Sequence, residues 1–200
     1  KGAYQVSGGL NGVGAKCVNA LSDSFIAEVS REGEVHQMKF SRGEVTQSIK
    51  VIGKTKRTGT KITFHPDPEI FVATQEFKYD TIVRRMRELA FLVPGITVEM
   101  KDQRSNRADK FEFKDGIAEY VSFLNANEER LFDKPILISA EVDFTDLSNP
   151  RVMADGEKPK PGQRRMTLDV ALQYNDRYDE MVFSYANLIN QPEGGTHLSG

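Results

Sequence analysis

The sequence predicts an α+β fold in two domains. Its 200 residues exceed the common domain size of about 100–150 residues, so two modest cores are expected. Apolar residues recur at helical spacing over residues 79–93, where a Pro-Gly pair ends the pattern. β-Rich runs lie on both sides of this helix, and those of the second half are expected to pair as an antiparallel sheet. We place the domain boundary near Lys114, which gives domains of residues 1–113 and 114–200.

The first half is predicted to begin with a glycine-rich loop that leads into a short helix. The loop covers residues 8–14, and residues 15–21 have apolar spacing that suits a helix. A β-hairpin is expected next, because two β-rich runs flank a Glu-Gly turn. A polar, lysine-rich connection over residues 50–57 then leads into a further strand that Pro66 ends. The hairpin strands cover residues 25–30 and 35–40, and the further strand covers residues 58–64.

The chain after the central helix is expected to hold short strands, one helix and a long loop. Residues 143–166 are rich in Pro, Gly and Lys and poor in core-forming residues, which indicates a long mobile loop. The run at 167–174 places alternate apolar side chains on one face, as in a half-buried strand. The expected elements are strands at 96–101 and 110–113, a helix at 117–125, and strands at 136–142, 167–174 and 181–189.

Charge and cysteine content exclude several classes of function. The chain has 27 Lys and Arg against 29 Asp and Glu, so it lacks the positive excess of a dedicated nucleic-acid binder, and any DNA contact must be local or made elsewhere. A single cysteine, Cys17, cannot form an intramolecular disulfide, and the histidines do not fall at zinc-ligand spacing. No apolar run reaches the roughly 18 residues that span a membrane. We therefore expect a cytoplasmic protein with no structural metal and no membrane contact.

The glycine-rich loop carries the strongest chemical signal. Gly8, Gly9, Gly12 and Gly14 permit close backbone approach, so main-chain N–H groups here can surround phosphate oxygens. The helix that follows adds a partial positive charge at its N-terminus. The pattern is not a Walker A loop, because no Gly-Lys-Ser/Thr closes it, and it is not a convincing dinucleotide fingerprint. From the pattern alone, a glycine-rich turn that only caps a helix stays an alternative to phosphate binding.

The longer run from Tyr4 to Ser22 resembles the ATP-lid motif of the B subunits of bacterial type II DNA topoisomerases, DNA gyrase and topoisomerase IV. The resemblance continues, in the family's order and approximate spacing, through Arg31-Glu32-Gly33, Thr58-Gly59-Thr60 and the runs at 87–92 and 192–197. It implies the C-terminal part of a GHKL (Bergerat) α/β sandwich in the first domain. The start of an α+β transducer domain, similar to ribosomal S5 domain 2, would follow from Lys114.

The resemblance also implies roles for individual residues in an ATP site. Tyr4 is expected on the adenine side, and Thr60 in a hydrogen-bond network that fixes the adenine. Arg31 is expected at the outer edge, where coumarin-type inhibitors bind in this family. Asn11 departs from the histidine of most gyrase B subunits, which leaves gyrase and topoisomerase IV both open. The ATP-binding set is completed by Gly8, Gly9, Leu10, Asn11, Gly12, Val13, Gly14 and Lys16.

In this family a glutamate activates water, an asparagine holds magnesium and an aspartate reads adenine, all in motifs expected before Lys1. The sequence is thus expected to be an internal fragment with no catalytic residue or metal ligand of its own, and inactive alone. The intact protein is expected to couple hydrolysis of ATP, with Mg²⁺, to DNA strand passage and so to supercoiling or decatenation. Its partners would be DNA, the DNA-cleaving A subunit of gyrase or topoisomerase IV, and a second B subunit in an A2B2 assembly.

Several alternatives are kept. A mismatch-repair or chaperone-type ATPase of the same superfamily shares glycine-rich lids but not the run from Tyr4 to Ser22, and the chain by itself could be a folded, inert piece without nucleotide binding. Cys17 is expected to be buried rather than reactive. The arginines of the central helix are expected to form a solvated face, and the cations of the 143–166 loop to be solvated rather than to contact DNA. These arginines are Arg84, Arg85 and Arg87, and the loop cations are Lys158, Lys160, Arg164 and Arg165.

Overall fold

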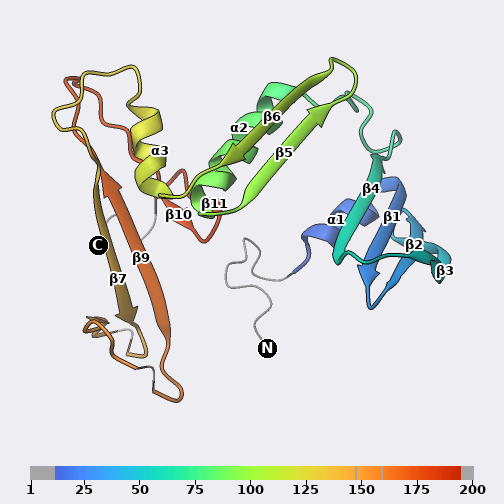
Figure 1. The fold of residues 1–200 in the computed structure, drawn as a ribbon, viewed down its shortest axis with the longest axis horizontal. Helices are drawn as coiled ribbons and strands as arrows, with labels where there is room; N and C mark the ends of the chain where they lie inside the picture. Colours follow the sequence, from blue (N-terminus) through green and yellow to red (C-terminus); the bar gives the residue numbers. More distant parts are fainter. Residues whose placement is uncertain (1–11, 147, 159, 195–200) are drawn as a thin grey trace. The chain divides into compact units, whose positions relative to one another are not determined.

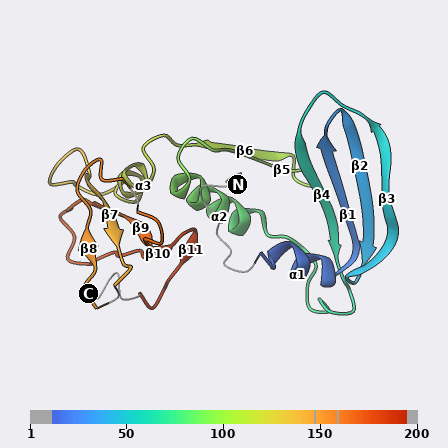
Figure 2. The same cartoon turned by 90° about the horizontal axis from the view of Figure 1, so that it is seen from below.

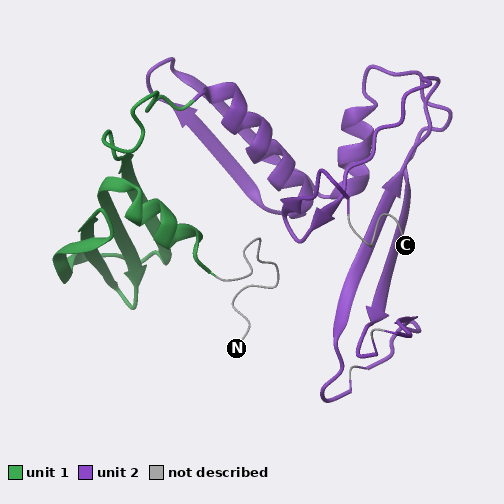
Figure 3. Ribbon diagram, turned by 180° about the vertical axis from the view of Figure 1, so that it is seen from behind, with its two compact units in different colours: residues 1–77 green, residues 78–200 purple. Residues whose placement is uncertain are grey.

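The protein divides into two compact units, shown in different colours in Figure 3. Unit 1 comprises Lys1–Phe77, and unit 2 comprises Lys78–Gly200. Among the residues that this computed structural model describes, no helix is both long and apolar enough to cross a membrane. The described residues are 12–146, 148–158 and 160–194.

Unit 1 is a short helix followed by a four-stranded antiparallel sheet of order β3-β2-β1-β4, and Figure 2 shows the strands side by side. Tight turns join the first three strands. Each turn pairs a non-glycine with a glycine at positive φ, Glu32 and Gly33 at 54° and 88° and Arg42 and Gly43 at 52° and 86°. Such paired positive angles are the type I′ turns that suit twisted hairpins. The elements are α1 Gly14–Ala20, β1 Ser22–Arg31, β2 Glu34–Ser41, β3 Glu44–Lys54 and β4 Gly59–Pro66.

The two faces of this sheet differ in polarity. Directly opposite residues share a face, and Phe25 is opposite Phe40, with the two rings edge to face at 5.9 Å. On the other face, Glu28 accepts a hydrogen bond of 3.1 Å from Gln37 and lies 3.0 Å from the Lys61 ammonium. The face that carries Phe25 is therefore the apolar face of the sheet.

Helix α1 packs on the apolar face. Val18 of α1 and Leu21, which follows the helix, line a cavity of about 210 Å³ together with Phe64, which is opposite Phe25 in the register of β4 with β1. The segment that follows β4 contributes Phe71 and Phe77 to the same cavity, and the Phe77 ring meets Phe64 edge to face at 6.0 Å. The helix that follows the glycine-rich loop is thereby attached to the sheet.

The outer strand β3 corrects one prediction. It extends from Glu44 to Lys54 and so includes much of the 50–57 stretch that is expected from sequence to be a connection. Lys50 lies opposite Gln37 of β2. Lysine is common on edge strands because its charge discourages pairing with another chain. The polar composition here therefore marks an edge position within the sheet rather than a break in it.

Unit 2 packs its helices on pairs of antiparallel strands. Helix α2 contacts the β5–β6 hairpin, and α3 contacts β9 (Figure 1). Tyr79, Val83 and Ala90 of α2 form a buried cluster with Phe111 of β6. The elements are α2 Tyr79–Leu92, β5 Thr97–Asp102, β6 Arg107–Glu112, α3 Ile117–Leu124, β7 Ile136–Asp143, β8 Arg151–Val152, β9 Arg165–Leu172, β10 Tyr185–Ala186 and β11 Ile189–Asn190.

The strand expected at 181–189 is present only as two short pieces. Strands β10 and β11 pair with each other, so the chain reverses direction between them. Asn187 in this reversal has a φ of 54°, which Asn tolerates better than most residues. A hairpin therefore replaces the predicted continuous strand.

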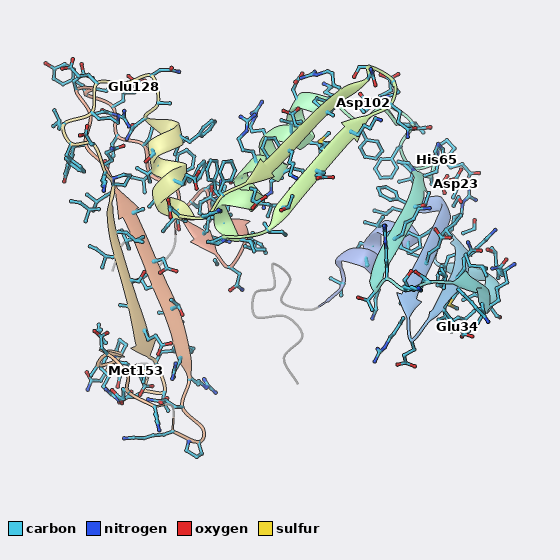
Figure 4. All side chains as sticks on the ribbon, in the orientation of Figure 1. Asp23, Glu34, His65, Asp102, Glu128 and Met153 are labelled. Carbon is cyan, nitrogen blue, oxygen red and sulfur yellow. The ribbon has the colours of Figure 1, made fainter. Side chains whose placement is uncertain are left out.

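The segment between β7 and β9, expected to be a long mobile loop, has defined contacts in its described part. Strand β8 pairs with the end of β7. Met153, labelled in Figure 4, is buried and donates its backbone N–H to the Glu141 carbonyl at 2.8 Å. Arg151 donates a hydrogen bond of 2.9 Å to Glu157. These contacts fold the first half of the segment back onto β7.

Candidate functional site

The end of the glycine-rich loop leads directly into α1. Tyr4 and residues 8–11 lie outside the described residues. Gly12 has a φ of 62°, Val13 precedes the helix and Gly14 is its first residue. A Cβ at Gly12 would meet no atom within 4 Å, so the backbone conformation, and not crowding, favours glycine here. Positive φ at this point turns the chain into the helix.

This junction has features that suit an anionic group. The first N–H groups of a helix have no helical acceptor, and α1 has no acidic residue in its first turn that would compete for them. Lys16 is exposed in the same turn. Backbone donors and a cation together match the chemistry of phosphate oxygens. The described residues contain no group of three or more His, Cys, Asp or Glu side chains that could hold a metal ion.

Thr60 and Arg31 lie near one another on neighbouring strands. Thr60 of β4 is opposite Val29 of β1, and Arg31 is two residues further along β1. Because side chains alternate between faces, Thr60, Val29 and Arg31 point to the same face. Phe64 also belongs to this face and lines the cavity with α1. The structure therefore brings Thr60 and Arg31 together, on the face of the sheet that α1 covers at the other end of β4.

Arg31 is available to a ligand. Its side chain is 74% exposed, and its Nε lies 3.1 Å from a carboxylate oxygen of the equally exposed Glu32. An exposed pair of this kind contributes little to stability. The guanidinium is therefore held only weakly at the end of β1.

An ion pair between the buried Asp67 and the half-exposed Arg42 lies where α1 joins the sheet, and no sequence signal identifies it. The Asp67 side chain is 1% exposed, and Arg42 donates to its two carboxylate oxygens at 2.6 and 3.2 Å. The Arg42 guanidinium holds the pKa of Asp67 below its usual range, and the Glu69 backbone N–H acts in the same direction. The backbones of both residues bond to the α1–β1 connection, Asp67 to Leu21 at 3.0 Å and Arg42 to Ser22 at 2.7 Å. The pair thus fixes α1 against the sheet.

Other polar groups of unit 1 are more exposed. Asp23 and His65, labelled side by side in Figure 4, lie 2.9 Å apart on neighbouring strands. The expectation that Cys17 is buried is wrong, because the described structure leaves it exposed. Its thiol lies one residue beyond Lys16 in α1.

The expectation of a solvated arginine face on α2 holds only for Arg84, which is exposed. The Arg87 guanidinium lies over the rings of Phe111 and Phe123, at 5.1 and 5.2 Å from their centroids. Arg85 donates a hydrogen bond of 2.8 Å to the backbone carbonyl of Leu188. The apolar stems and planar heads of two of the three arginines are part of the packing of unit 2.

Comparisons with known proteins agree with the fold. A family model described as DNA gyrase B matches residues 116–200. The chain is 44% identical over 199 residues to the B subunit of DNA gyrase from Clostridium acetobutylicum, and 45% identical over 200 residues to that from Halalkalibacterium halodurans. Each alignment covers all of this chain and 28% of the relative, so the chain spans little more than a quarter of the length of these relatives.

A solved structure resembles the chain over nearly its whole length. The 43K ATPase domain of Thermus thermophilus gyrase B, crystallised in complex with an aminocoumarin, superimposes with a TM-score of 0.75 at 37% identity. The superposition covers 94% of this chain and 46% of that one. The predicted α+β class with antiparallel sheets is confirmed.

Proposed function

The chain belongs to the DNA gyrase B family of type II topoisomerases, and from this membership we propose that it is part of the region that binds ATP and couples its hydrolysis to DNA strand passage. The observation that carries the proposal is the junction at Gly12. A glycine with positive φ leads into a helix whose first turn bears Lys16 and no acidic residue. This is the chemistry that phosphate oxygens require.

The proposed site uses the residues expected from sequence. The backbone of residues 8–14 and the Lys16 ammonium hold the phosphates, and Tyr4 contacts the adenine side. Thr60 helps to fix the adenine, and Arg31 lies at the outer edge. The shared sheet face of Thr60 and Arg31 supports this arrangement, as does the exposure of Arg31. Because the Thermus thermophilus domain holds an aminocoumarin, we propose that the same class of inhibitor binds here and contacts Arg31.

We propose that residues 1–113 belong to the ATPase domain and residues 114–200 to the transducer. The match of the family model to residues 116–200 supports a boundary near Lys114. The compact units divide earlier, after Phe77, because α2 and its hairpin pack within unit 2. The boundary near Lys114 follows the start of the family match, whereas the division after Phe77 follows the packing of the chain into two compact units.

The intact protein, in this proposal, is a cytoplasmic ATP-hydrolysing topoisomerase that supercoils or decatenates DNA. It acts with Mg²⁺, with a second B subunit, and with a DNA-cleaving A subunit. We also propose that these 200 residues alone do not hydrolyse ATP, because the family's water-activating glutamate and magnesium ligand match no motif of this sequence. Phosphate release by the purified 200-residue chain would contradict that second part.

The phosphate assignment is tested in the full-length protein by calorimetric titration with a nonhydrolysable ATP analogue and magnesium. Gly12→Val is expected to abolish binding, because a β-branched residue does not adopt the backbone angle found here. Gly53→Val is the matched control, since Gly53 has no positive φ and an added Cβ would meet nothing within 4 Å. Unchanged nucleotide affinity in Gly12→Val would refute the phosphate assignment. An equal loss of affinity in Gly12→Val and Gly53→Val would mean that both variants misfold, and the phosphate assignment would then lose the support of this experiment.

A further inference from the structure

A ring of polar contacts joins α2 to the β10–β11 hairpin. The Tyr185 hydroxyl donates to one carboxylate oxygen of Glu88 at 2.5 Å. Arg85 donates to the other oxygen of Glu88 at 2.6 Å and to the Leu188 carbonyl at 2.8 Å. The ring is closed, because Tyr185 lies in β10 and Leu188 lies in the turn of the same hairpin. The helix therefore holds the hairpin at two points.

The ring lies in aromatic surroundings. The Glu88 side chain is 16% exposed, and Tyr120 of α3, whose ring lies 6.0 Å from Phe183, stacks on Phe91 of α2. Burial and the neighbouring Glu88 carboxylate both raise the pKa of Tyr185, so its hydroxyl keeps its proton and donates. A poorly exposed carboxylate is costly to leave without partners. If the hairpin left α2, Glu88 would lose the Tyr185 hydroxyl and the Leu188 carbonyl would lose Arg85.

The helix that carries the ring is the first element of unit 2. The division between the units falls at Phe77, and α2 begins at Tyr79. The covalent chain from unit 1, which carries the glycine-rich loop, thus enters unit 2 through the N-terminus of α2. Arg85 and Glu88 lie within the next three turns of the same helix. Because α2 both receives the chain from unit 1 and holds the hairpin through Arg85 and Glu88, the position of this helix sets the position of the hairpin.

We propose that Arg85, Glu88 and Tyr185 are positioning residues that make α2 and the β10–β11 hairpin one rigid body, and so carry the effect of nucleotide binding from unit 1 to the chain beyond the hairpin. The inference rests on the proposed function, since it requires a nucleotide in unit 1 and work done on DNA. The cluster lies in unit 2, and its proposed part is to couple nucleotide binding in unit 1 to DNA strand passage. In this proposal Arg85 links α2 to the hairpin through Glu88 and the Leu188 carbonyl, and it does not belong to a solvated face.

The test uses the full-length B subunit in complex with its A subunit. Tyr185→Phe removes only the hydroxyl, and Glu88→Gln keeps an acceptor for Tyr185 while weakening the attraction to Arg85. Both variants are expected to bind a nonhydrolysable ATP analogue within about twofold of wild type, yet to complete about fivefold fewer strand passages per ATP hydrolysed. Arg84→Ala is the control, because it changes the charge of the same helix at an exposed position.

A lowered melting temperature with an unchanged number of strand passages per ATP would mean that the ring is only structural, and it would overturn the inference. The same loss of coupling in Arg84→Ala would also overturn it, because any charge change on α2 would then suffice. If the wild-type protein itself binds no nucleotide, the proposed function fails, and the inference fails with it. Failure of the proposed function is distinguished from a purely structural ring because it is seen in the wild-type protein, without any variant.

Hydrogen exchange on the wild-type assembly gives a second test that does not depend on how a variant folds. The Ala186 and Ile189 backbones lie opposite each other in the hairpin, so exchange of the hairpin amides reports on its docking. Addition of the ATP analogue is expected to change their exchange rates by about threefold or more, and Tyr185→Phe to remove that response. Identical rates in wild type with and without the analogue would refute the proposed coupling.

Discussion

The side-chain amide of Gln163 donates a hydrogen bond of 2.6 Å to a carboxylate oxygen of Asp143, and so fastens the two ends of the segment between β7 and β9. Thr145 donates to the other oxygen from its hydroxyl at 2.6 Å and from its backbone N–H at 2.9 Å. These donors, with Gln163 the largest contributor, lower the pKa of Asp143 to about 2. The base of this segment is therefore organised around an ionised carboxylate.

Replacing Gln163 is expected to raise the pKa of Asp143. Since the folded pKa lies below the unfolded value of about 3.9, the interaction stabilises the fold above about pH 4 and is lost as the pH falls toward about 2. In Gln163→Ala the carboxyl loses its largest stabilising donor, so its pKa moves toward the ordinary value. An NMR titration of the Asp143 carboxyl carbon measures this, with Gln75→Ala in unit 1 as control. Equal titration midpoints in wild type and Gln163→Ala would contradict the prediction.

Replacing Arg42 is expected to destabilise unit 1. In Arg42→Ala the Asp67 carboxylate, 1% exposed, loses its ionic partner and keeps the Glu69 backbone N–H. We expect the melting temperature to fall by about 5–10 °C. Arg31→Ala removes an arginine from a pair that is exposed on both sides, and it should change the melting temperature by about 1 °C or less. Equal shifts in the two variants, measured by circular dichroism, would argue against a structural role for the Arg42–Asp67 pair.

Local sequence signals predict the helices well. The apolar periodicity places the central helix at 79–93, and α2 is Tyr79–Leu92. A helix is expected at 117–125, and α3 is Ile117–Leu124. Strands are predicted well where their side chains alternate, but β3 is missed because its edge position favours lysines that resemble a loop. The positive φ of Asn187 divides a run whose composition alone indicates one strand.

In the candidate site, too, local features are predicted from sequence and contacts between distant residues are not. The helix that follows Gly12 is one continuous stretch of sequence, so its local apolar spacing predicts it. The contact of Arg42 with Asp67 spans 25 residues, and that of Tyr185 with Glu88 spans 97. Such pairs have no local periodicity, because they depend on how distant elements pack. They become visible only when the fold is known.

Replacing Gly116 by alanine is expected to destabilise unit 2. Gly116 precedes α3 with φ 59° and ψ −129°, a combination that side chains rarely permit, and an added Cβ would lie 2.8 Å from Cγ of Pro94. A cost of about 1–3 kcal/mol is expected. Gly156→Ala is the control, since Gly156 has positive φ but open space around it. Urea denaturation should show the larger loss for Gly116→Ala, and the reverse order would mean that the Pro94 ring yields easily.

Replacing Phe91 by alanine is expected to cost unit 2 more than any change of an exposed ring. Phe91 is 1% exposed, and its ring stacks on Phe113 at 3.6 Å and on Tyr120 at 4.9 Å. Removing it leaves a cavity between α2 and α3, with an expected loss of about 3–5 kcal/mol. Tyr178→Ala, at a fully exposed position, should change stability by less than about 0.5 kcal/mol. If urea denaturation gave similar losses for both variants, Phe91 would not be the centre of this packing, and the rigid body proposed for α2 and the hairpin would lack its support.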